Sequence, residues 1–526
     1  MKKLLFTCLL AVLVLTLTAC PKKNPPASFI FPDLAATIIQ GETKDITVSI
    51  KRDPDFTESI SFSRTALPAG ITADNFKPAS TTASSSILPL KATSVAKIGE
   101  YNITLKATAD SGVEKTANLL LKIEAPATIT VSGRVVAAFS GKPLDNIEVF
   151  IEGHSSVKTK ANGQFTISNV TAPYDLIAIK SSSKVVMIYQ GLTRTDPIIF
   201  FQGFSEGSKT KSAKIEGTVS GGAAYPLPPS YVSKIVAVDT SQNEGITYTA
   251  GISDKTGAYK YLAKWRNDST TTIDMHALQW KEAAGVPVAY TGYGKLTGIA
   301  LTDGDMLKNQ DIVLQAIGST RFKGHVSVPN AYEVDSKKMY INFDNKSFMR
   351  TVKDSSSKLD FDYPSPQIAG AKLDLELSAR NANSHSLRFL TGLALNTGPI
   401  NIEIPKAAEP LKPDNNATEI DNSTSFSWSS FANGIYFVEI VRSFDLSHDQ
   451  PFYYFYTKDT SITIPDLTAF GLELPKSTEY EWDIVGIAPY KSVDQAAALE
   501  PFSDTYYTQP DVQFSHSELR KFKTAP

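Results

Sequence analysis

One short pattern occurs three times in this chain: an apolar residue, any residue, Gly, any residue and Val. The copies occupy residues 131–135, 215–219 and 322–326. Their spacing is that of whole small domains, which are typically about 50 to 200 residues long, rather than that of short solenoid repeats. The pattern therefore predicts three related modules in the middle of the chain.

Alternating apolar and polar residues follow the pattern, with the period typical of β-strands that bury one face. In the first module, Asn162 and Gly163 lie between two such segments, and this dipeptide accepts the positive φ of a tight hairpin turn. The second module has Gly257 in a similar turn, whereas residues 344–347 of the third have no following glycine. The first two modules resemble the carboxypeptidase regulatory-like domain, a prealbumin-type β-sandwich without catalytic residues of its own. The relation of the third module to this family stays open.

Two further segments resemble other β-sandwich families. Residues 67–72, followed by 99–101, resemble bacterial immunoglobulin-like surface domains, in which the tyrosine packs where a strand leaves the sandwich edge. Near the C-terminus, Trp428 falls in an early strand. Residues 474–480 match the approach to a tyrosine corner, whose hydroxyl bonds back to upstream backbone. This last segment resembles a fibronectin type III domain.

These observations predict an all-β chain of serial antiparallel β-sandwich domains, without the run of amphipathic helices that an α/β enzyme needs. We expect the domains to form a semi-rigid stalk, with the fibronectin-like domain farthest from the membrane. The predicted divisions are a lipoprotein signal peptide (1–19), a tether (20–28), an immunoglobulin-like sandwich (29–126), two regulatory-like sandwiches (127–208 and 209–319), a divergent third sandwich (320–408) and a fibronectin type III-like domain with a polar, frayed tail (409–526).

The first twenty residues predict where the protein resides. Lys2 and Lys3 precede an apolar run over residues 4–17, and small residues lead into Cys20. This is the order of a secretory signal peptide, and the run is shorter than the roughly 20 residues that span a bilayer as a helix. The segment resembles the lipobox of bacterial lipoproteins, which implies a mature chain anchored through lipidated Cys20. Pro21 is not the aspartate that marks inner-membrane retention in enteric-type bacteria, so the outer membrane or cell surface is expected.

Charge and cysteine content exclude several classes of partner and cross-link. The formal net charge of −2 over 526 residues provides no basic field for nucleic acid. The two cysteines, Cys8 and Cys20, both lie in the signal and anchor region, so the mature domains contain no disulfide. The expected partners are the membrane, through the lipid, and an envelope protein or a glycan.

Several motifs could carry chemistry but lack the context that it needs. Residues 203–207 match the nucleophile-elbow pattern around Ser205, yet a polar segment follows where a helix is required. Asp303 with Asp305, and Asp360 with Asp362, do not continue into a calcium-binding loop. The histidines have none of the close spacing of zinc ligands: His154, His276, His325, His385, His448 and His516. We therefore predict no catalytic residues, no metal and no cofactor.

One aromatic run is a candidate ligand site. On a strand, Phe452, Tyr454 and Tyr456 share one face, while Tyr453 and Phe455 share the other. An exposed face of this kind could stack on sugar rings, and packing within the core or against a neighbouring domain is the alternative. The sequence as a whole predicts a lipid-anchored envelope protein that acts by binding, adhesion or scaffolding rather than by catalysis. A carbohydrate-binding accessory lipoprotein that uses these aromatics is the second hypothesis.

Overall fold

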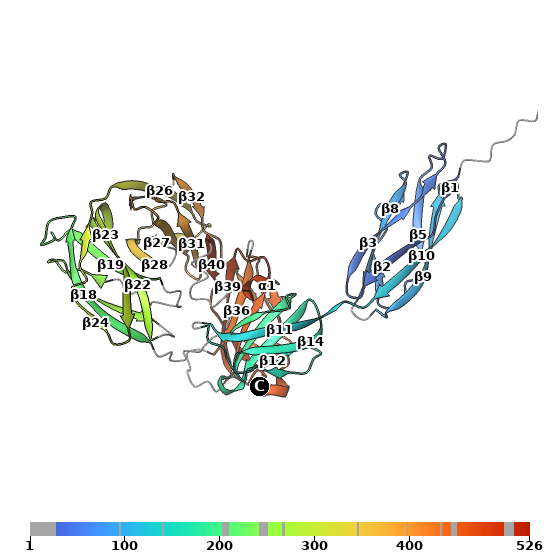
Figure 1. Ribbon diagram of the computed structural model, residues 1–526. Coiled ribbons are helices and arrows are strands. Elements are labelled where there is room, and N and C mark those ends of the chain that lie inside the picture. The colour runs from blue at the N-terminus through green and yellow to red at the C-terminus, as the bar shows by residue number, and fades with distance from the viewer. Residues whose placement is uncertain are drawn as a thin grey trace, which may run out of the picture. The chain divides into compact units, whose positions relative to one another are not determined.

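The computed structural model describes residues 28–526, except 94–95, 139–140, 202–209, 241–250, 266–268, 344–346, 397, 432–433, 443–449 and 499–509. In this part of the chain almost every element is a β-strand, which confirms the all-β class. The helical elements described are two short 3-10 turns, Ser181–Ser183 and Thr468–Phe470, and the helix α1 (Val493–Ala496). The chain forms two compact units, which divide after Ala127 (Figure 1).

The first unit is a sandwich of two main sheets. The five-stranded sheet has the order β2-β10-β9-β5-β7, the three-stranded sheet has the order β3-β8-β6, and β1 pairs with β4. The strands are β1 (Phe29–Ile30), β2 (Leu34–Ile39), β3 (Thr43–Ser49), β4 (Lys51–Arg52), β5 (Ile60–Arg64), β6 (Ile71–Ala73), β7 (Ser80–Thr81), β8 (Ser85–Ala92), β9 (Gly99–Ala109) and β10 (Glu114–Glu124).

The chain enters this unit at one end and leaves it at the other. At one end the backbone of Ser28 is held by Asp53, through an N–H to Oδ2 bond of 2.9 Å and the reverse backbone bond of 3.0 Å. At the other end the Gln40 N–H donates to the carbonyl of Glu124, at 2.9 Å. Tyr101 lies at this second end, where its hydroxyl donates to the Lys97 carbonyl at 2.5 Å.

The second unit contains three modules with one plan of strands. In each, the strand that carries the repeated glycine pairs antiparallel with one neighbour and parallel with the last strand or strands of the module. A second sheet of four strands completes each sandwich. The third module therefore shares the architecture of the other two, although its sequence diverges.

The strands of the modules follow in chain order. The first module has β11 (Thr128–Ala137), β12 (Glu148–Ile151), β13 (Val157–Lys158), β14 (Gln164–Thr171), β15 (Tyr174–Lys180), β16 (Val185–Leu192) and β17 (Ile198–Phe201). The second has β18 (Lys211–Gly221), β19 (Tyr231–Asp239), β20 (Gly251–Ile252), β21 (Ala258–Trp265), β22 (Thr270–Ala283), β23 (Val286–Thr302), β24 (Met306–Leu307) and β25 (Ile312–Leu314). The third has β26 (Ser319–Ser327), β27 (Glu333–Phe343), β28 (Ser347–Asp354), β29 (Asp360–Pro366), β30 (Lys372–Arg380), β31 (His385–Leu393) and β32 (Ile400–Glu403).

In each module, the valine of the repeated pattern donates its backbone N–H to the turn that precedes the fourth strand. Val135 donates its N–H to the carbonyl of Gly163, and Val219 donates to that of Gly257. A Cβ on Gly163 would lie 2.5 Å from the Val135 carbonyl oxygen, so the turn approaches β11 too closely for a side chain. In the third module Val326 donates to Leu359 instead, at 2.9 Å.

The third module thus has its matching turn at residues 355–359, which contain no glycine. Lys337 holds this turn: its fully buried Nζ donates to the carbonyls of Ser356 and Lys358, at 2.7 and 3.1 Å. In all three modules the turn joins strands of different sheets, so it crosses the sandwich rather than closing the predicted hairpin.

The C-terminal domain does not end a linear stalk. Its strand β37 pairs in parallel with β16 of the first module, and its strand β40 pairs antiparallel with β31 of the third. One 14-stranded sheet consequently runs through three domains, with the C-terminal domain in the middle (Figure 1). The domain comprises β33 (Pro410–Lys412), β34 (Ala417–Ile420), β35 (Phe426–Trp428), β36 (Ile435–Val441), β37 (Phe452–Thr457), β38 (Ser461–Ile462), β39 (Glu479–Ala488), β40 (Asp511–His516) and β41 (Arg520–Thr524).

One expectation for this domain needs correction. The tail is not frayed, because β41 pairs with both β34 and β39. The short helix α1 contacts the first module, where the Asp494 carboxylate accepts the Thr193 N–H at 2.8 Å. Trp428 and Tyr480 are buried in the core as expected, and the Tyr480 hydroxyl donates to the Pro451 carbonyl at 3.2 Å.

Candidate functional site

Three side chains from the middle of the long sheet form one row on the same face. Tyr454 on β37 lies opposite Glu439 on β36, and Glu439 lies opposite Asp483 on β39. Directly opposite residues of antiparallel strands have Cβ atoms about 4.5–5.5 Å apart, so the three side chains are neighbours. Each is partly buried. We call Tyr454, Glu439 and Asp483 the acid–aromatic row.

The row has unusual electrostatics. Burial and, to a smaller extent, the neighbouring Asp483 raise the pKa of Glu439 to about 7. Burial also raises the pKa of Asp483 to about 6. The pKa of Tyr454 is raised by burial and by Glu439. Around neutral pH the two carboxyl groups therefore take up protons that exposed carboxylates would release.

The two carboxyl groups have no hydrogen bond or ion pair to any other residue that the structure describes. A pair of this kind, beside a half-buried phenol ring, offers hydrogen-bond donors and acceptors next to an apolar surface. Such a surface suits a polar ligand of low charge, because a protonated carboxyl donates and a carboxylate accepts. The sequence signal was an acid within a mainly apolar strand, Glu439 within 435–441 and Asp483, beside Glu481, within 480–488.

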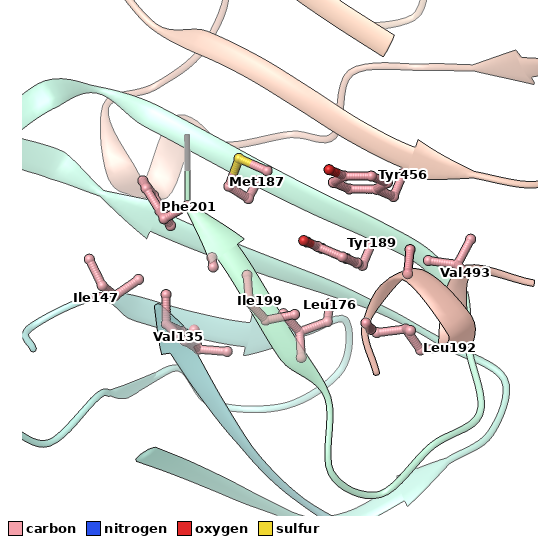
Figure 2. Packing of buried hydrophobic residues seen from close by; sticks show 14 of the residues in the cluster. Val135, Ile147, Leu176, Met187, Tyr189, Leu192, Ile199, Phe201, Tyr456 and Val493 are labelled. Atoms are coloured by element: carbon pink, nitrogen blue, oxygen red, sulfur yellow. The ribbon is translucent and has the colours of Figure 1, made fainter. Parts of the chain in front are cut away.

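The glycan-binding hypothesis requires an exposed aromatic face, and the strand 452–457 is more buried than that. Tyr456 is 1% exposed, and its ring stacks on Tyr189 of the first module at 4.7 Å between centroids (Figure 2). Tyr453 and Phe455 on the opposite face are fully buried. A solvent-facing set of three rings is therefore absent from this described strand, because Tyr456 packs in a cluster with side chains of the first module. Of the predicted set, Phe452 and Tyr454 keep partial exposure.

The fold brings two of the dispersed histidines together. His385 on β31 and His516 on β40 are direct cross-strand neighbours. His276 is buried and its Nδ1 lies 2.8 Å from the Tyr293 hydroxyl oxygen. The other described histidines are separate, and His448 lies outside the described residues.

His154 and His325 each line a pocket. A pocket of about 410 Å³ in the first module is lined by His154 together with Glu152 and Asp175. Burial raises the pKa of Asp175, and the Gly191 N–H, which donates to it at 2.8 Å, opposes this shift. In the third module a pocket of about 390 Å³ includes His325, whose Nδ1 lies 2.8 Å from Asp360.

The predicted carboxylate pairs are engaged elsewhere. Asp303 accepts from Lys211 at 3.1 Å, and Asp305 accepts from the Thr302 N–H at 2.6 Å. Asp362 pairs with Arg321 at 2.7 Å. Within the described ranges, no three histidine, cysteine or acidic side chains are grouped so as to hold a metal ion.

The remaining sequence candidates cannot be placed. Cys20 and the 203–207 motif with Ser205 lie outside the described residues. A search of the described helices finds none long and apolar enough to cross a membrane.

Comparisons with known proteins find similarities among solved structures alone. No family model and no curated protein matches the chain. Among solved structures it is similar to the Bacillus anthracis TIE protein, with 10% identity over 73% of this chain and 76% of that chain and a TM-score of 0.21. It is also similar to an endo-fucoidan hydrolase from glycoside hydrolase family 107 (12% identity, 48% of this chain, 32% of that chain, TM-score 0.16). A tetra-tandem repeat in the extending region of a large adhesion protein is a further match (12%, 86% and 95%, TM-score 0.11). At these TM-scores the similarities carry no conclusion about function.

Proposed function

We propose that this chain is an exported lipoprotein, anchored through Cys20, that acts as a non-catalytic binding scaffold of the cell envelope. The continuous sheet carries this proposal. It fixes three domains in one arrangement by backbone hydrogen bonds and presents the acid–aromatic row at its centre. A sheet that joins domains in this way supports a rigid surface for a partner better than a flexible series of separate modules does.

The first unit has the form of a spacer between anchor and scaffold. Its chain enters at the end where Asp53 holds Ser28 and leaves at the opposite end, beyond Glu124. The eleven-residue strand β10 alone spans roughly 35 Å, at about 3.3 Å per residue. Together with the predicted tether 20–28, this length would separate the anchor from the point where the chain leaves the first unit.

The anchor can be tested with a matched pair of variants. Cys20→Ser removes the proposed lipidation site, so the protein should leave the membrane fraction while it stays folded. Cys8→Ser changes the other cysteine, within the signal, and should remain membrane-bound. Fractionation with a carbonate wash measures both. A Cys20→Ser protein that still pellets with membranes would contradict the lipid anchor.

Glycan binding is the second candidate function. It is favoured by the partly exposed Phe452 and Tyr454 beside the two carboxyl groups of the row, since sugars need both hydrogen bonds and an apolar contact. Tyr454→Ala should abolish binding on a glycan array, and the buried Tyr456 cannot contact a sugar directly. If wild type binds no glycan, or if Tyr454→Ala binds as well as wild type, this candidate fails and the scaffold proposal stands.

A further inference from the structure

Two imidazoles face each other where the third module meets the C-terminal domain. His385 begins β31 and His516 ends β40, and the two residues are directly opposite in an antiparallel pair. Their side chains therefore project from the same face of the sheet, with Cβ atoms about 4.5–5.5 Å apart. The residues are 131 positions apart in the sequence by their numbers, so no spacing motif announces the pair.

Both side chains are available to a ligand from solvent. His516 is exposed and His385 is half-buried. Neither imidazole has a hydrogen bond or an ion pair to another residue that the structure describes. The charged side chains around His385 are already paired, because Arg380 binds Asp335 at 3.0 Å and Lys338 binds Glu376 at 2.5 Å.

The protonation of the pair also favours metal binding. The pKa of His385 is lowered by burial, and Asp335 opposes this shift while Arg380 adds to it. The pKa of His516 is lowered because the surrounding protein desolvates part of its ring, and His385 lowers it further. Both rings are accordingly neutral at pH 7 and keep the free lone pairs that a metal ion requires.

We propose that His385 and His516 together bind a divalent transition-metal ion of the Zn²⁺ class, which bridges the third module and the C-terminal domain. Imidazole nitrogens bind Zn²⁺ at about 2.0–2.1 Å in tetrahedral sites, so two ligands must approach to roughly 3.3 Å. Rings on directly opposite strand positions can reach this separation by rotation about their side-chain bonds. Since the described residues provide no third protein ligand, water or an external group completes the coordination.

The metal class follows from the ligands. Imidazole suits Zn²⁺, Ni²⁺ and Cu²⁺, whereas Ca²⁺ and Mg²⁺ require oxygen ligands. An ion bound to both histidines favours the joined state of β31 and β40, so it should stabilise the second unit in proportion to its concentration.

The test uses the full mature chain without a histidine affinity tag. Isothermal titration with Zn²⁺ at pH 7.5 should show one site, and the melting temperature should rise with Zn²⁺ but not with Ca²⁺. His385→Gln and His516→Gln should each weaken Zn²⁺ binding by more than about 10- to 100-fold. Loss of a residue that only supports a metal ligand already weakens binding by that factor, so loss of the ligand itself should cost more. The double variant should lose no more than either single variant, because one ligand alone does not hold the ion.

Two controls make the result decisive. His325→Gln, which alters a separate histidine bonded to Asp360, should bind Zn²⁺ as wild type does. Wild type at pH 5 should lose Zn²⁺ as the imidazoles become protonated, and this measurement needs no variant. The proposal is overturned if wild type shows no Zn²⁺ binding, if the double variant binds normally, or if Ca²⁺ stabilises the protein as much as Zn²⁺.

Discussion

The first and third modules attach to the C-terminal domain through strands in the same position of their shared plan, yet the two junctions differ in chemistry. At the first, β16 and β37 bring together apolar and aromatic residues along the whole pairing, from Val185 opposite Phe452 to Tyr189 opposite Tyr456. At the third, β31 and β40 place serine opposite serine, Arg388 opposite Gln513 and histidine opposite histidine.

The first junction resembles a hydrophobic core, and the third resembles an interface between domains. The Tyr189 and Tyr456 side chains are buried within one hydrophobic cluster that includes residues of both domains. The third junction adds to this cluster only the buried Val512 and the partly buried Phe389 and Phe514, and a bidentate ion pair joins Arg388 to Asp511 at 2.9 and 2.7 Å. The first module and the C-terminal domain should therefore unfold together, whereas the third module has a smaller apolar contact and depends more on polar contacts that respond to solution conditions.

The largest effect is expected where the first junction is broken. Tyr456→Ala removes a fully buried ring between Tyr189 and Phe437, whose centroids lie at 4.7 and 4.8 Å. Truncation of a buried aromatic costs about 3–5 kcal/mol. Chemical denaturation of the mature chain, followed by near-ultraviolet circular dichroism, measures the loss.

A comparison at the other junction makes this result specific. Phe514→Ala truncates a half-buried ring on β40 and should cost clearly less than Tyr456→Ala. Equal losses in the two variants would show that the two junctions do not differ as core and interface.

A smaller effect is expected when the polar junction is cut. Arg388→Ala removes the pair with Asp511 and a bond to the Glu403 carbonyl at 2.5 Å. Because the Asp511 side chain is 38% exposed, solvent screens the pair, and we expect a loss of about 1–2 kcal/mol. The midpoint of denaturation should fall further at low salt than at high salt. Insensitivity to salt would indicate that Arg388 acts through packing alone.

Much of the architecture could be predicted from local patterns. Alternation and the repeated glycine pattern are local signals, and they predicted an all-β chain with three similar modules. The pairing of β16 with β37 could not be predicted, because it joins residues 267 positions apart, such as Val185 and Phe452, and the strand edges carry no distinguishing sequence. The same holds for the candidate site. The run 452–456 was visible, but its burial depends on the first module, and Glu439 and Asp483 became partners only through the sheet register.

The smallest effect concerns the acid–aromatic row, which lies between the two junctions. The folded pKa values of Glu439, about 7, and Asp483, about 6, exceed their ordinary values of 4.5 and 3.8. The folded state therefore binds protons more tightly than the unfolded state, and stability falls as pH rises from about 4 through 7. Asp374, with a pKa raised to about 6, acts in the same direction, while the lowered pKa values of His385 and His516 oppose it.

Glu439→Gln isolates the contribution of the row, because the other groups are common to wild type and variant. The glutamine cannot ionise, so the variant should gain stability relative to wild type above pH 7. We expect about 1 kcal/mol, less than the full pKa shift from 4.5 to about 7 would give, because solvent screens the partly exposed side chain. The difference should shrink toward zero as pH falls to 5, where Glu439 is protonated in the folded protein. Denaturation midpoints from pH 5 to pH 8.5 measure this directly. A stability difference between variant and wild type that stays constant across this range would mean that Glu439 ionises as an exposed residue of the polar junction does. The acid–aromatic row would then not belong with the buried side of the sheet.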